Sequence, residues 1–155
     1  MNLNTVIQDV VTFVEPDTRQ AASQIILQAN EPDLIVLVDD IQIQQVLVNL
    51  IRNALDAMQE TPIDQRKVTI STQLNENGQA EVLVRDTGQG IDQDEVELVF
   101  NAFFSTKQEG MGMGLAISRS IIEAHEGNFW ANSSNGPGAT FGFTLPVAMN
   151  QNIGT

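Results

Sequence analysis

A chain of 155 residues is long enough for one domain with a buried core, and 42% hydrophobic against 17% charged residues is typical of a globular protein. The 20 acidic and 7 basic residues give a formal net charge of −13, which argues against nucleic acid or an anionic membrane surface as a partner. The absence of cysteine excludes disulfides and thiolate metal sites, and no apolar run reaches the length of a membrane span.

The first sixty residues are predicted to hold two helices with two strands between them. Apolar residues spaced three and four apart predict a helix over residues 3–14, which Pro16 ends. Short β-branched runs predict strands at 24–28 and 34–38, paired around a turn. A second helix is expected over residues 41–59, with the pair Asp39-Asp40 as its N-cap.

The rest of the chain is predicted to consist mostly of strands. Strands over 67–74 and 80–85 form a hairpin around the turn Asn75–Gly78. A short acidic helix near 92–98, a helix over 113–125 and two final strands, 128–133 and 139–146, follow. This order predicts an α+β sandwich with helices on one face of a mainly antiparallel sheet. We expect one domain over residues 1–147 and a flexible tail over 148–155.

The helix over 41–59 carries a polar stripe opposite its apolar face. Asn49, Asn53 and Asp56 lie together on the helical wheel, whereas a merely solvated face normally carries better helix formers such as Lys or Glu. The stripe indicates side-chain amides held for a ligand. An ordinary polar face is the alternative.

Two glycine-rich segments are candidate ligand loops. Asp86-Thr-Gly88-Gln-Gly90-Ile91 follows a strand directly, so its carboxylate is fixed in place and can accept from an exocyclic amine such as that of adenine. A plain turn is the alternative. Gly110, Gly112, Gly114 and Leu115 precede a helix whose N-terminus suits phosphate, and Lys107 lies just upstream. A flexible surface loop is the alternative there.

Three further features have both a functional and a structural interpretation. Phe100, Phe103 and Phe104 cluster within five residues and are expected to anchor a loop to the core. Thr140 is a candidate for a hydroxyl beside Asp86, although Thr is also a routine strand residue. His125, the single histidine, falls in the apolar arc of its helix and is interpreted as a packed structural residue rather than a phosphoacceptor.

In this order the motifs resemble the ATP-binding catalytic domain of sensor histidine kinases, within the superfamily shared with DNA gyrase, Hsp90-type chaperones and MutL. The matching segments are Asn49–Ala57 (asparagine box), Asp86–Ile91 (first glycine box), Phe100–Lys107 (phenylalanine box), Gly110–Leu115 (second glycine box) and Gly136–Phe141 (closing glycine-rich box). The resemblance covers residues 3–146. It implies a Bergerat-type two-layer sandwich, with a mixed, mainly antiparallel sheet on about three helices and ATP between the layers.

The resemblance also implies roles for single residues in binding ATP and Mg²⁺. Asp86 would accept from the adenine amine, with Thr140 helping through a water. Asn53 would be the metal ligand, and Asn49 and Asp56 would support phosphate, ribose or metal-bound water. Asn53 and Lys107 would be the catalytic residues. The implied nucleotide site is completed by Gly88, Gly90, Ile91, Phe104, Lys107, Gly110, Gly112, Gly114 and Leu115.

The function implied by the resemblance is that of a protein-histidine kinase, which transfers the γ-phosphoryl group to a histidine on a separate dimerisation and acceptor domain, with a response regulator downstream. In the ATP-hydrolysing branches of the superfamily, the position that Asn49 resembles holds a Glu that activates water. An amide at Asn49 cannot act as a base, which favours transfer over hydrolysis. No acceptor hairpin is expected upstream of residue 3, so the chain alone should be monomeric and should not label itself.

The expected location is cytoplasmic, in a parent kinase that is either free or membrane-anchored, with no nucleic-acid or membrane contact by this domain. Two alternative functions remain. One is a stand-alone serine kinase of the anti-sigma-factor type, and the other is a non-catalytic nucleotide-binding module.

Overall fold

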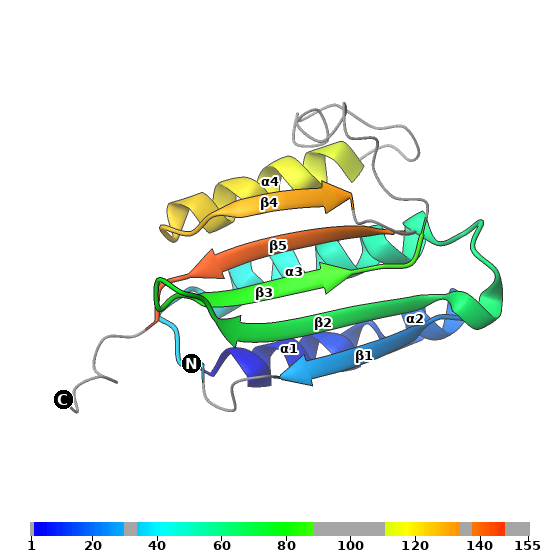
Figure 1. Ribbon diagram of the computed structural model, residues 1–155, viewed down its shortest axis with the longest axis horizontal. Coiled ribbons are helices and arrows are strands. Elements are labelled where there is room, and N and C mark those ends of the chain that lie inside the picture. Colours follow the sequence, from blue (N-terminus) through cyan, green and yellow to red (C-terminus); the bar gives the residue numbers. More distant parts are fainter. Residues whose placement is uncertain (1, 30–33, 89–110, 134–137, 148–155) are drawn as a thin grey trace.

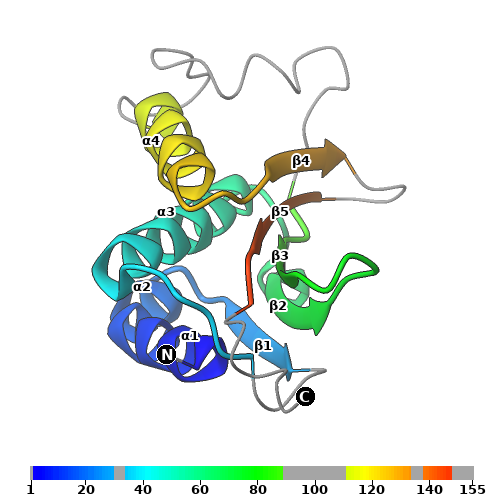
Figure 2. The same cartoon turned by 90° about the vertical axis from the view of Figure 1, so that its left-hand side faces the viewer.

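The protein is a two-layer sandwich in which one sheet packs on a layer of helices, as Figures 1 and 2 show from two sides. The computed structural model describes residues 2–29, 34–88, 111–133 and 138–147. The helices are α1 (Leu3–Phe13), α2 (Glu15–Gln20), α3 (Asp40–Ala57), the 3₁₀ turn η1 (Ile63–Gln65) and α4 (Met111–Ala124). The strands are β1 (Gln24–Ala29), β2 (Lys67–Leu74), β3 (Ala80–Arg85), β4 (Phe129–Ser133) and β5 (Ala139–Leu145). The predicted α+β sandwich is confirmed.

The five strands lie in the order β1-β2-β3-β5-β4. β1 runs parallel to β2, and every other neighbouring pair is antiparallel, so the sheet is mixed and mainly antiparallel. The predicted β2–β3 hairpin is confirmed, with a turn closed by the Asn75 side chain, which accepts from the backbone N–H groups of Asn77 and Gln79. Alternating buried residues along β2 and β3 turn one face of this hairpin toward the helices.

One predicted strand is absent. Residues 34–38 form only isolated bridges, from Ile35 to Asn2 and from Val36 to Val147, and do not pair with β1. β1 instead takes β2 as its partner, in a parallel pair whose connection runs through α3. The apolar run 34–38 is explained by burial, because Leu34 and Val36 are core residues. An apolar run of this length does not by itself distinguish a strand from a buried extended segment.

Pro16 does not end the helical part of the N-terminal segment as predicted. α1 ends at Phe13, and Pro16 lies in the first turn of a second short helix, α2. A proline is tolerated there because the first helical N–H groups have no intrahelical acceptor to lose. The predicted acidic helix near 92–98 lies outside the described residues. None of the helices that the structure does describe is both long and apolar enough to cross a lipid bilayer.

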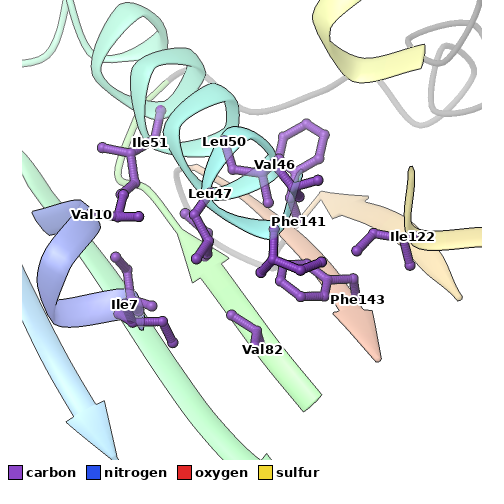
Figure 3. Close-up of a cluster of buried hydrophobic side chains, with 14 of the residues drawn as sticks. Ile7, Val10, Val46, Leu47, Leu50, Ile51, Val82, Ile122, Phe141 and Phe143 are labelled. Atoms are coloured by element: carbon purple, nitrogen blue, oxygen red, sulfur yellow. The ribbon is translucent and has the colours of Figure 1, made fainter. Parts of the chain in front are cut away.

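The core lies between the sheet and the helices α1, α3 and α4. Figure 3 shows Val10 of α1 and Ile51 of α3 pointing toward one another, and Ile122 of α4 beside Phe143 of β5. All four of these side chains are buried. On the opposite face of the sheet, Trp130 lies over Gly142, where an added Cβ would contact the indole ring and the Leu83 side chain.

The end of the α3–α4 pair at which α3 begins and α4 ends is fixed by polar contacts outside the core. The predicted N-cap of α3 is confirmed, since the Asp39 carboxylate accepts from the N–H groups of Ile41 (3.0 Å) and Gln42 (3.2 Å). The Asp39 backbone N–H donates to His125 Nε2 (3.2 Å), and His125 Nδ1 lies 2.8 Å from the carbonyl oxygen of Ile121. His125 is thus hydrogen-bonded on both ring nitrogens and only partly exposed, as expected of a structural histidine.

Candidate functional site

Asn49, the first residue of the polar stripe of α3, contacts α4. Asn49, Asn53 and Asp56 are all partly buried, whereas the neighbouring Arg52 is exposed. The Asn49 amide Nδ2 donates to the hydroxyl oxygen of Ser118 in α4 (3.3 Å). The structure therefore places Asn49, the first residue of the stripe, beside α4.

Asp56 has one carboxylate oxygen with no hydrogen bond. Its Oδ1 atom accepts from Gln59 Nε2 (3.0 Å), whereas its Oδ2 atom is buried and makes no hydrogen bond within the described part of the chain. Asp56 also lines a cavity of about 500 Å³, together with Asp17, Arg52 and Arg66. A buried carboxylate oxygen without a donor is costly, so a cation or a water is expected beside it.

Asp86 lies at the end of β3 with its side chain only 2% exposed. Its Oδ1 atom accepts from the backbone N–H groups of Gly88 (2.8 Å) and Ala139 (3.3 Å). These bonds hold the carboxylate at a defined position where the first glycine motif meets β5. A carboxylate oxygen held in place by backbone donors can accept from an amine of a bound ligand.

Two glycines bring the separate motifs into contact. A Cβ on Gly88 would clash with the carbonyl oxygen of Ala57, the last residue of α3. Gly138 has a φ of +103°, and its Cβ would clash with the carbonyl oxygen of Asp86. The C-terminal end of α3, the end of β3 and the start of β5 therefore meet at one corner of the molecule. Figure 1 shows these three ends, together with the start of α4, at the same end of the molecule.

The second glycine motif is placed only in part. Gly112 and Gly114 lie in the first turn of α4, which begins at Met111 rather than at the predicted residue 113, and Leu115 is buried. α4 therefore begins at the end of the molecule where α3 and β3 end (Figure 1). Seven of the predicted residues lie outside the described ranges. They are the site residues Gly90, Ile91, Phe104, Lys107 and Gly110, and the phenylalanines Phe100 and Phe103.

Thr140 is not where the sequence predicted. Its cross-strand partner is Arg85, whose Nε donates to Thr140 Oγ1 (3.4 Å). Side chains alternate along a strand, so Thr140 shares with Arg85 the sheet face that points away from the helices, whereas Ala139 adjoins Asp86. The prediction of a Thr140 hydroxyl beside Asp86, acting through a water, is therefore wrong.

Sequence reasoning missed Ser118, which is completely buried in α4. A single serine in the apolar arc of a helix gives a weak signal, because small residues are common in cores. The described side chains also include no group of three or more His, Asp or Glu that could hold a metal ion by themselves. A divalent cation at this corner would need further ligands from a bound molecule.

Comparison with known proteins agrees with this fold. The family described as "Histidine kinase-, DNA gyrase B-, and HSP90-like ATPase" matches residues 38–149, and the chain belongs to this family. Within it, the relatives are sensor histidine kinases, and the chain is an ATP-binding catalytic domain of that type.

Among the relatives, the sensor protein FixL of Bradyrhizobium diazoefficiens is 52% identical over 114 residues, which cover 74% of this chain and 22% of FixL. The sensor histidine kinase ZraS of Salmonella typhimurium is 37% identical over 97% of this chain and 32% of its own length. This chain therefore spans a third or less of these curated relatives. The catalytic domain of histidine kinase ThkA has a TM-score of 0.83 at 33% identity, with 95% of this chain and 93% of that domain covered.

Proposed function

We propose that the corner formed by α3, the end of β3, the start of β5 and the start of α4 binds ATP with Mg²⁺, for transfer of the γ-phosphoryl group to a histidine of a separate acceptor domain. The observation that carries the proposal is the buried Asp86 carboxylate, oriented by Gly88 and Ala139 at the junction of the three motifs. A full-length relative, ShkA, 26% identical, has been solved in complex with AMPPNP, an ATP analogue.

Asp86 would select adenine through hydrogen bonding. A carboxylate can only accept, and the exocyclic amine of adenine donates, whereas guanine presents a carbonyl oxygen at the equivalent position. Burial strengthens this preference, because an acceptor facing an acceptor out of water leaves two unpaired polar groups. The backbone bonds to Oδ1 keep the carboxylate from rotating away.

Asn53 is the proposed protein ligand of Mg²⁺, and Asp56 supports the hydrated ion from the next turn of α3. The buried, unpartnered Oδ2 atom of Asp56 fits a cation or its water, although the same side chain also borders the cavity beside Arg52. When bound with the nucleotide, Mg²⁺ would neutralise charge on the phosphates. The chain's own contribution is to position the nucleotide and to exclude water from the adenine end.

The acceptor histidine would come from another domain. His125 is held by Asp39 and Ile121 at the far end of α4, so it is not positioned to receive a phosphoryl group from this corner. The amide of Asn49 cannot act as a base, which supports transfer rather than hydrolysis. ThkA, 30% identical, has been solved in complex with the response regulator protein TrrA, which supports a response regulator as a downstream partner.

The nucleotide proposal is tested by calorimetric titration of the wild type and Asp86→Asn with ATP and with GTP, both with Mg²⁺. Asparagine keeps an oxygen for the Gly88 and Ala139 bonds but adds a donor, so ATP affinity should fall by about tenfold or more while the fold persists. Asp9→Asn, at an exposed position of α1, is the matched control and should bind as the wild type does. Unchanged ATP affinity in Asp86→Asn would remove Asp86 from the site.

The transfer proposal is tested with the acceptor hairpin of a related histidine kinase supplied in trans with Mg-ATP. The hairpin should acquire acid-labile phosphate, and Asn53→Ala should abolish this label through loss of the metal ligand. Label that is acid-stable and resides on serine would favour the serine-kinase alternative. Tight ATP binding without any transfer would favour a non-catalytic nucleotide-binding module.

A further inference from the structure

The contact between α3 and α4 contains one buried hydroxyl. Ser118 is 0% exposed and lies between the buried residues Leu115 and Ile122 of α4. A hydroxyl removed from water needs a hydrogen-bond partner, and Ser118 finds one in the Asn49 amide, 69 residues away in the sequence. The pairing therefore links the helix that begins with the second glycine motif to the helix that carries the asparagines.

This hydrogen bond decides which end of the Asn49 amide faces the site. An asparagine amide has a donor end and an acceptor end, and its terminal torsion is soft enough for either to point in a given direction. Here Nδ2 is engaged by Ser118. The opposite end, Oδ1, makes no hydrogen bond to any residue within the described ranges, so it is available as an acceptor.

We propose that Ser118 is a positioning residue that holds the Asn49 amide with its carbonyl oxygen toward the nucleotide. α3 then presents two amide oxygens, from Asn49 and Asn53, to the hydrated cation on the phosphates. This inference rests on the proposed nucleotide function and adds to it a residue that never touches the ligand. Oxygen is the ligand type that Mg²⁺ and its waters favour, so the orientation of Asn49 affects metal-dependent binding rather than binding of the base.

Two other arrangements make different predictions. In the first, Ser118 only fills a buried position, so its loss would change stability and leave metal-dependent binding alone. In the second, the amide is reversed, the Ser118 hydroxyl donates to Oδ1, and Asn49 offers a donor to the nucleotide. Asn49→Asp separates the reversed arrangement from the proposed one, because aspartate offers oxygen from both ends.

The test measures ADP affinity by calorimetry with and without Mg²⁺. The metal dependence is the dissociation constant without Mg²⁺ divided by the dissociation constant with Mg²⁺. Ser118→Ala should lower this ratio by about fivefold, the effect of one hydrogen bond. Ser120→Ala, at an exposed position of the same helix, should not change it. In the Asn49→Asp background both ends are acceptors, so adding Ser118→Ala should change the ratio by less than about twofold. Ser118→Cys, a poorer acceptor of similar size, replaces Ser118→Ala if that variant fails to fold.

Each result bears on one claim. Failure of the wild type to bind ADP, or binding that Mg²⁺ does not strengthen, would overturn the nucleotide proposal itself. Normal wild-type behaviour with the same fivefold loss in both the Asn49 and Asn49→Asp backgrounds would overturn the role of Ser118. An unchanged ratio in Ser118→Ala and Ser118→Cys would also overturn it. Weaker ADP binding by Asn49→Asp both with and without Mg²⁺ would establish the reversed amide instead, because the donor to the nucleotide is lost.

Discussion

α3 has a neighbour on each side, and the two contacts differ in chemistry. Figure 2 shows α1 and α4 on opposite sides of α3. The α1 side meets α3 through buried aliphatic side chains such as Val10 and Ile51, and on the exposed rim of this side Asp17 of α2 forms an ion pair with Arg52. The α4 side adds the hydrogen bonds Asn49–Ser118 and Asp39–His125.

This difference separates stability from positioning. The stabilisation from apolar contact is roughly proportional to the area buried and has no preferred direction. The α1 contact therefore holds α3 on the sheet without fixing the orientation of any single side chain. Hydrogen bonds depend on angle and distance, so the α4 contact fixes how α3 and α4 are placed relative to one another. The directional contact is the one beside the candidate nucleotide site. Variants on the two sides should therefore differ in kind as well as in size.

The largest effect is expected on the apolar side. Leu47→Ala, at a fully buried position of α3, should lower the free energy of unfolding by about 2–5 kcal/mol, because a cavity remains. The folded fraction should keep its nucleotide affinity. Denaturant unfolding measures the first quantity and titration below the transition measures the second. Ile41→Ala, 71% exposed in the same helix, is the control, and equal costs for the two variants would contradict the comparison.

The C-terminal end of α3 provides a third contact, which should affect stability and binding together. Gly88→Ala places a methyl group against the carbonyl oxygen of Ala57 and should cost about 1–3 kcal/mol as α3 and the Asp86 turn move apart. Nucleotide affinity should fall with it. The control is Gly78→Ala in the β2–β3 turn, where φ is +76° but no atom lies near the new Cβ. Backbone strain destabilises that variant, yet its nucleotide affinity should be that of the wild type.

The polar link at the far end of α4 should matter for stability but not for binding. His125→Ala removes the acceptor for Asp39 N–H and the contact with the Ile121 carbonyl oxygen, and should cost about 1–2 kcal/mol in thermal or denaturant unfolding. Nucleotide binding should stay nearly intact. Robust self-phosphorylation of the wild-type chain that vanishes in His125→Ala would contradict this assignment and make His125 the acceptor.

The smallest effect is expected from the ion pair on the α1 side. Arg52 Nε lies 3.0 Å from Asp17 Oδ2, and both side chains are exposed. A double-mutant cycle of Arg52→Ala and Asp17→Ala should give a coupling energy below about 1 kcal/mol, reduced further by salt. A coupling of several kcal/mol would show that this side also has a strong directional contact.

Local patterns predicted the elements whose signals agree with one another. The strands over 67–74 and 80–85 were predicted to the residue, because alternation along each strand coincides with an Asn-rich turn that ends in Gly78. The segment 34–38 was predicted wrongly, because its β-branched run reflects burial of Leu34 and Val36 and not pairing. Single-sequence patterns carry no information on which distant strand is available as a partner.

The site was predictable where a motif identifies a residue, and not where the register decides. Asp86 was placed correctly at the end of its strand, whereas Thr140 was assigned to the wrong face. A shift of one residue along a strand moves a side chain to the opposite face of the sheet. The motif spacing alone does not show whether Ala139 or Thr140 lies on the face of Asp86. Ser118 was missed because its partner lies on another helix, and only tertiary structure shows that contact.

Trp130 is the chain's single tryptophan, and it lies over Gly142 on the sheet face turned away from α3 and α4. Its fluorescence should therefore follow unfolding of the sheet while remaining insensitive to an occupant of the opposite corner. A thermal melt read at this one chromophore would report the upward shift of the transition that a ligand produces by mass action, without optical interference from the ligand contact itself. Trp130 is thus an intrinsic fluorescence probe of thermal unfolding, and the shift of the melting temperature with ligand would rank the nucleotide affinities of all the variants without a label.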